Sequence, residues 1–292
     1  MGKIVSAIVD YKLMNTIKIE KDKHIAFFIL PRSGTTVLRA YLCDLLGYRN
    51  ATELFNHYVT GTDIKIQDGR ITKWLNSDTR PKMTRDELIA RSFNYLDTLT
   101  TLTEMNELAV FSIYADSFYQ YCPTLLPALS VRNDIQFIKQ ERADVLYASL
   151  SALISLKTTV FHNIDAVSKT RTTIPEYFDP EKIFDMLTAY VNERKEIHKH
   201  FPDLPTIYYE QFQMTPANMM HLFEGIPKKI ISLRVSKFSE NCKNLVTNLD
   251  EIEGLYEKFV NDNIEFFPQY NGTHRIDIPE CQGRQPKIWR KI

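Results

Sequence analysis

The chain lacks an excess charge of either sign, and it has little glycine. Its 292 residues include 36 Lys and Arg, 36 Asp and Glu, and only nine Gly. Because the net charge is zero, a general affinity for nucleic acid or anionic membranes is not expected, although a local basic site remains open. The sequence contains no low-complexity tract and no run of about 18 apolar residues. These absences predict a globular, cytoplasmic protein that binds neither nucleic acid nor a membrane.

Cysteine is also sparse. The four cysteines, Cys43, Cys122, Cys242 and Cys281, lie far apart and form no CxxC pair. Neither a zinc site nor a disulfide framework is therefore expected, and free thiols in a reducing compartment fit this pattern. The carboxylates and histidines show no clustered spacing of the kind that metal ligands have, so no metal is expected.

Short apolar runs alternate with amphipathic stretches along the chain. Residues 24–30, HIAFFIL, are apolar, aromatic and β-branched, and they predict a fully buried strand that stops before Pro31. Residues 35–48 predict a helix, because their apolar positions recur at helical spacing and Gly47 supplies a C-terminal stop. A strand, a tight turn and a helix are the opening of an α/β fold with a parallel sheet.

The same alternation continues to residue 262 without a linker. Further strands are predicted at 108–116, 134–140 and 205–212, and further helices at 143–156, 179–201, 215–227 and 248–262. The mixed, polar residues 60–108 predict an insertion or a helical excursion. We therefore expect one α/β domain over residues 1–292, with a P-loop-like parallel sheet flanked by helices and with helical insertions. Residues 60–108 and 157–178 are candidate insertions for binding an acceptor.

The segment LPRSGTT joins the first strand to its helix and resembles a phosphate-binding loop. The free N–H groups and the dipole at a helix N-terminus favour an anion. Gly34 lets the backbone approach closely, and Ser33, Thr35 and Thr36 add hydroxyl donors. The lysine of the G-x-x-x-x-G-K-[ST] loop is absent, and the positive charge has moved to Arg32. A forked guanidinium there can bind a phosphate oxygen and the atom that bridges to a leaving group.

PRSGTT is similar to the 5′-phosphosulfate loop of sulfotransferases that use 3′-phosphoadenosine-5′-phosphosulfate (PAPS), whose recurrent form is P-[RK]-[ST]-G-[ST]-[TS]. The resemblance is closest to bacterial enzymes of the trehalose-sulfotransferase type. In these enzymes, a segment of the form G-x-x-x-E-x-F follows the first helix and supplies an acid proposed as the catalytic base. GYRNATELFNHY is the matching stretch, in which Glu53, Phe55 and Tyr58 correspond to the acid and the aromatic residues.

Three later stretches fit the same family in the same order over residues 24–260. FIKQERADVLYASLSAL resembles the segment with an arginine and a serine for the 3′-phosphate, TIYYEQFQMTPANMMHLFEGIP the Y-E-[DQ]-[LF] segment, and VTNLDEI the S-N-x-[ED]-E-[LI] element. The resemblance implies Arg142 as the cation for the 3′-phosphate, with Lys139 as the alternative. The choice between Ser149 and Ser151 stays open. Glu210 is expected to support a neighbouring loop by hydrogen bonds rather than to take part in catalysis.

The resemblance implies transfer of a sulfuryl group from PAPS to a hydroxyl of a small-molecule or carbohydrate acceptor, with PAP as the product and no metal. Such a reaction needs aligned reactants and stabilised charge on the leaving phosphate, a role for Arg32 and the loop. Glu53 is the first candidate for the base, because a carboxylate buried beside an anionic donor has a raised proton affinity. His57 is the second candidate.

Two other functions stay open at this stage. A P-loop kinase for a small metabolite would use the same strand, loop and helix, although the missing lysine and the lack of an evident magnesium-binding Asp oppose it. A nucleotide-binding protein that has kept the fold without the chemistry is the other alternative. The segment PRSGTT can also be a plain strand-to-helix turn, since Pro, Ser and Gly are common turn residues.

Overall fold

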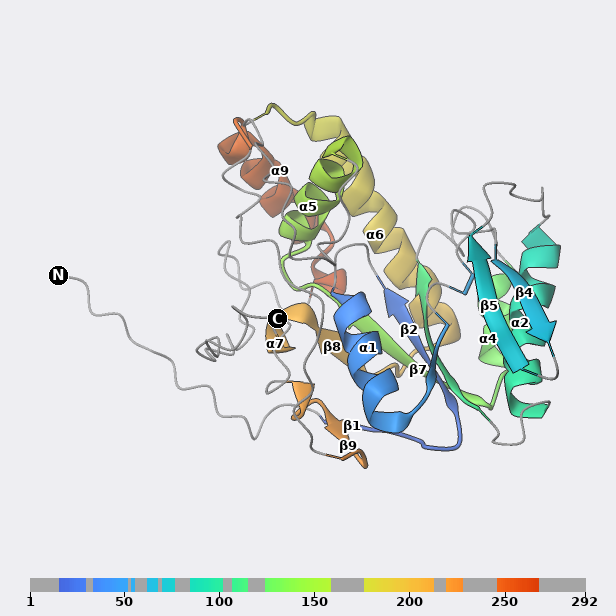
Figure 1. Cartoon of the computed structure of the whole chain (residues 1–292). Coiled ribbons are helices and arrows are strands. Elements are labelled where there is room, and N and C mark those ends of the chain that lie inside the picture. The colour runs from blue at the N-terminus through green and yellow to red at the C-terminus, as the bar shows by residue number, and fades with distance from the viewer. Residues whose placement is uncertain are drawn as a thin grey trace, which may run out of the picture.

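A parallel sheet of five strands forms the centre of the molecule (Figure 1). In spatial order its strands are β3 (Arg49–Asn50), β6 (Ala109–Tyr114), β2 (His24–Ile29), β7 (Ile135–Glu141) and β8 (Thr206–Tyr208). All four pairings are parallel, and every residue of the central strand β2 is buried. The predicted α/β class, the parallel sheet and the buried first strand are thus confirmed.

The structure is a computed structural model, and it describes residues 16–29, 34–51, 54–55, 62–67, 70–76, 85–101, 107–114, 124–158, 176–212, 219–227 and 246–267. Within these ranges, no helix has both the length and the hydropathy needed to cross a bilayer.

Helices flank the sheet on both faces. Their bounds are α1 (Thr35–Leu46), α2 (Arg85–Thr101), α4 (Leu125–Ser130), α5 (Val145–Thr158), α6 (Pro180–His200), α7 (Tyr209–Phe212) and α9 (Leu249–Asp262), followed by a 3-10 turn at Ile264–Phe266. The helices predicted at 35–48, 143–156, 179–201 and 248–262 are confirmed to within two residues at each end. Local signals explain this agreement. Gly47 ends α1 in the left-handed conformation, and Asp179 accepts a hydrogen bond from the Glu181 N–H at the start of α6.

The central strand divides the apolar interior into two layers, because successive side chains of a strand point to opposite faces. Ile25 and Phe27 pack with α1 on one face. Ala26 and Phe28 pack on the other face with α2, α4 and the last turn of α6. A third apolar cluster joins α5, α9 and the first turns of α6. The helix α6 therefore connects the sheet to the α5–α9 pair.

Two predicted elements differ from the structure at their ends. The strand predicted at 205–212 ends at Tyr208, which pairs with the last residue of β7, Glu141. Beyond that point the ladder has no further partner, and the chain turns into α7, where the Gln211 side chain accepts from the Tyr208 N–H at 2.8 Å. The helix predicted at 215–227 begins outside the described residues, and its end is wrong, because Phe223–Glu224 forms the strand β9.

The strand β9 exists because a distant segment pairs with it. Its partner is β1 (Ile17–Lys18), and the two strands are parallel. No local pattern in the sequence indicates that these segments meet. Between residues 60 and 108, the helical expectation is right for α2, whereas an antiparallel hairpin of β4 (Thr62–Gln67) and β5 (Arg70–Asn76) was not predicted. The Asp-Gly pair between these strands is a hairpin signal that could have indicated it.

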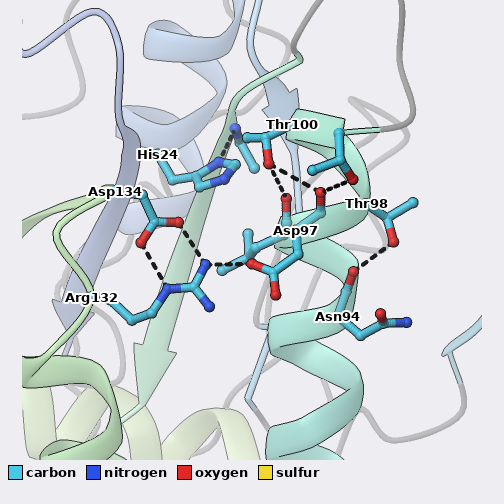
Figure 2. A network of polar contacts seen from close by, with 10 residues as sticks. His24, Asn94, Asp97, Thr98, Thr100, Arg132 and Asp134 are labelled. Carbon is cyan, nitrogen blue, oxygen red and sulfur yellow. Dashed lines mark hydrogen bonds and ion pairs between the residues drawn. The ribbon is translucent and has the colours of Figure 1, made fainter.

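A polar cluster closes the amino edge of the sheet. Figure 2 shows the guanidinium of Arg132 between Asp134, which it contacts at 2.7 and 2.6 Å, and Asp97 of α2, at 2.7 Å. Beside it, the fully buried His24 accepts a hydrogen bond at Nδ1 from the Ala109 N–H at 2.9 Å. An imidazole that accepts at Nδ1 is neutral. This cluster links α2 to the beginnings of three strands.

Folding stability is expected to fall as the pH drops below about 6.5, the pKa of histidine in an unfolded chain. Burial lowers the pKa of His24, and although Asp134 acts in the opposite direction, Arg132 adds to the effect of burial. Between the two pKa values, the unfolded chain therefore binds a proton that folded His24 does not. The contribution of His24 to the free energy of unfolding is complete above about pH 6.5, and it is lost as the pH falls to the lower pKa that His24 has in the folded protein. Urea unfolding between about pH 5 and about pH 7.5 measures this dependence.

The matched control is His24→Asn, whose side-chain oxygen can accept from the Ala109 N–H but does not titrate in this range. This variant should show a flatter dependence on pH. An equal slope in both proteins would assign the pH dependence to other groups.

Candidate functional site

The carboxyl edge of the sheet is where its connections diverge. The chain leaves β2 through α1 and reaches β3 and β6 on one side, whereas it leaves β7 through α5 and α6 and reaches β8 on the other. Ile29 and Gln140, near the ends of β2 and β7, are register partners. Open α/β sheets bind ligands at this kind of switch point, outside the carboxyl ends of the strands. The starts of α1, α5 and α7 all lie at this edge.

Gly34 begins α1 in a conformation that requires glycine. Its φ is 80°, in the left-handed region. A β-carbon at this position would lie 2.7 Å from Cδ2 of Tyr209 and 3.5 Å from Cε2 of Phe212. Any side chain would therefore strain the backbone and displace the Tyr209 ring. The described first turn of α1 contains no acidic residue, so its own side chains do not offset the positive end of the helix dipole.

Arg142 follows β7 directly and lies between two aromatic rings. Its guanidinium carbon is 4.1 Å from the ring centre of Tyr147 and 4.5 Å from that of Tyr209. The residue is only 8% exposed, and its Nε lies 3.6 Å from a carboxylate oxygen of Glu210. The two rings and this carboxylate orient the guanidinium plane at the sheet edge.

Glu210 fixes the loop that contains Arg142. Its carboxylate accepts hydrogen bonds from the Ala143 N–H at 2.9 Å and the Asp144 N–H at 3.4 Å. Burial raises the pKa of Glu210, although the N–H of Ala143 and the charge of Arg142 act in the opposite direction. The prediction that Glu210 supports a neighbouring loop is confirmed. It does so from the start of a helix rather than from a strand.

The sequence does not decide which of two serines of α5 is the candidate phosphate contact. The geometry of the helix distinguishes between them. Both are buried, with 6% of Ser149 and 7% of Ser151 exposed. Successive residues of an α-helix are rotated by roughly 100° about the helix axis. The two serines, which are two residues apart, therefore lie on nearly opposite sides of α5. Ser151 follows Tyr147 by four residues and shares its side of the helix. Because Tyr147 contacts Arg142, the geometry favours Ser151 as the serine on the side of Arg142.

Lys139, the alternative cation, belongs to a different environment. Its Nζ lies 3.0 Å from Glu141, which also forms an ion pair with Arg194 of α6. Lys139 and Glu141 share one face of β7, since they are two residues apart. The contacts with Tyr209 and Glu210 distinguish Arg142 from Lys139 as the cation beside the start of α1.

Several predicted site residues lie outside the described part of the chain. These are Arg32, Ser33, Glu53 and His57. Of the rest of the loop, Thr35 is buried and Thr36 is half-buried at the start of α1. Phe55, two residues after Glu53, is a core residue that packs against Phe93 and Phe111.

The structure brings together two predicted residues through one that was not predicted. Gly34 and Arg142 both contact the ring of Tyr209, to which the sequence reasoning gives no role. Its position in the segment TIYYEQF, directly after a strand, was the available signal. Tyr147 was also missed, because an aromatic residue on a helix is more often part of the core.

No protein-family model matches this chain, and no curated protein matches it either. The sulfotransferase resemblance therefore rests on the motifs and their order alone, and it stays a prediction.

Proposed function

We propose that this protein is a sulfotransferase that moves a sulfuryl group from PAPS to a hydroxyl of a small-molecule or carbohydrate acceptor. The observation that supports this proposal is the shared contact of Gly34 and Arg142 with the Tyr209 ring. A helix N-terminus and a buried guanidinium thus lie at one edge of the sheet. PAPS carries anionic groups at its 5′ and 3′ positions, and these two features suit them.

In this proposal the loop after β2 is P-loop-like and binds the 5′-phosphosulfate. The acceptor oxygen forms a bond to sulfur while the bond from sulfur to the bridging phosphate oxygen breaks, and PAP leaves with the electron pair. Glu53 takes the acceptor proton, with His57 as the second candidate base. The groups that bind the donor are Arg32, Ser33, Gly34, Thr35 and Thr36 at the 5′ side, and Arg142 with Ser151 at the 3′ side.

PAP is expected to raise the melting temperature of the wild-type protein, because a ligand that binds only the folded state stabilises it by mass action. The increase should be lost or strongly reduced in Arg32→Ala, since the charge beside the 5′-phosphate is removed. Thermal-shift titration with PAP, and with ATP plus magnesium for comparison, measures this. Arg91→Ala is the matched control, because Arg91 is exposed on α2 on the opposite face of the sheet from α1.

A response to ATP plus magnesium, without a response to PAP, would replace the sulfotransferase proposal with that of a P-loop kinase. Binding of PAP without turnover of PAPS on any hydroxyl acceptor would favour a binding protein of the same fold.

A further inference from the structure

The ring of Tyr209 lies between the two groups proposed to bind the donor. Gly34 adjoins its Cδ2 and Cε2 atoms, to which a β-carbon would come within 2.7 and 3.0 Å. Arg142 lies over the ring, 4.5 Å from its centre. Tyr209 as a residue is 5% exposed, and its ring packs edge-on against the fully buried Phe212, with 5.6 Å between ring centres. Tyr209 therefore has little freedom to move without displacing a neighbour.

The backbone that holds this ring is fixed as well. Tyr209 is the first residue of α7 and follows β8 directly. The next residue, Glu210, binds the two N–H groups that follow Arg142. The start of α7 is thus attached to the loop of Arg142 by the ring and by the carboxylate, and the same ring lies against Gly34 at the start of α1.

We infer that Tyr209 is a positioning residue that sets the separation between the anion-binding start of α1 and Arg142, and so selects ligands with two anionic groups. This inference rests on the proposed function. A ligand with two phosphates at a fixed separation gains from both positions only if the protein holds them at a matching separation before it binds. A ligand with the 5′-phosphate alone uses the start of α1 and does not depend on that separation.

The test compares the affinities of PAP and AMP, which differ by the 3′-phosphate, in isothermal titration. The wild type should bind PAP more tightly than AMP by about tenfold or more, as expected for a charge-assisted contact. Tyr209→Leu should lose most of this ratio while AMP affinity changes little. Tyr209→Phe keeps the ring and should restore the ratio. Should Tyr209→Leu fail to fold, Tyr209→His, with its smaller ring, should reduce the ratio in the same direction.

Tyr147→Leu is the matched control, because it removes the other ring from Arg142, whereas the side chains nearest to a β-carbon at Gly34 are those of Tyr209 and Phe212. It should lower the PAP-to-AMP ratio less than Tyr209→Leu does. An equal loss in both variants would mean that Tyr209 acts only by stacking on Arg142, which overturns the inference. An unchanged ratio in Tyr209→Leu also overturns it, while the proposed function stands. If the wild type binds no PAP, the proposed function itself is wrong, and the inference falls with it.

Discussion

Arg142→Ala is expected to weaken PAP binding by about 10- to 100-fold, since a hydrogen bond to a charged group contributes about 1.5–3 kcal/mol and each 1.4 kcal/mol is tenfold. Arg142 is buried between Tyr147 and Tyr209, where a charge interacts more strongly than in water. Arg142→Lys should recover little of the loss, because an ammonium neither stacks between two rings nor binds a phosphate in bidentate fashion. Isothermal titration at fixed ionic strength measures both variants.

The chain offers a second arginine in a comparable environment as the control. Arg132 lies over the Phe93 ring at 4.9 Å and forms ion pairs with Asp97 and Asp134, at the amino edge of the sheet. Arg132→Ala should destabilise the fold but leave the PAP affinity of the folded protein unchanged. If the two variants weaken PAP binding equally, the effect is one of stability, and the assignment of Arg142 to the donor site is wrong.

The second large effect is expected from the buried ion pair beside the site. Arg194→Met should reduce the free energy of unfolding by about 3–5 kcal/mol, because it leaves a buried carboxylate without its main partner. Glu141 and Arg194 expose only 4% and 8% of their side chains. Tyr190 also donates to Glu141, at 3.3 Å, and its pKa is raised well above the ordinary value by burial. Urea unfolding followed by circular dichroism measures the loss.

A double variant separates the charge from the packing. Glu141→Met with Arg194→Met replaces both charges by apolar side chains and should recover much of the stability, since an apolar pair in place of a buried ion pair is often neutral. Lys199→Ala is the control on the same helix, because the ion pair of Lys199 with Glu196, at 4.0 Å, is exposed. It should change stability by less than about 0.5 kcal/mol. A double variant no more stable than Arg194→Met would show that Arg194 stabilises mainly by packing.

The two predicted effects depend on the adjacent residues Glu141 and Arg142, which have different structural roles. Glu141 ends β7 on the side of α6, and Arg142 begins the next loop on the side of Tyr209. The ion pair with Arg194 holds the strand end, and Glu210 holds the loop that follows. We therefore expect Arg194→Met to lower stability without changing the PAP-to-AMP ratio of the folded protein, whereas Arg142→Ala should lower that ratio.

The elements that the sequence determined are those whose signals are local. The apolar run before Pro31 determined β2, and Gly47 determined the end of α1. The Asp-Pro start determined α6, because the cap and the fixed φ of proline act within one turn. The sequence also placed Gly34 at a strand-to-helix turn, where a positive φ is needed.

Only the tertiary structure decided the features that depend on residues far apart in the chain. The pairing of β1 with β9 joins residues 17–18 to 223–224, and this contact turned a predicted helix end into a strand. The choice of Arg142 over Lys139 depends on Tyr209 and Glu210, which approach only because β8 lies beside β7. Gly34 and Tyr209 are separated by most of the chain, and their contact comes from packing rather than from any local pattern. Local periodicity and capping fix an element within a few residues, but the distances inside a site are set by how the elements pack.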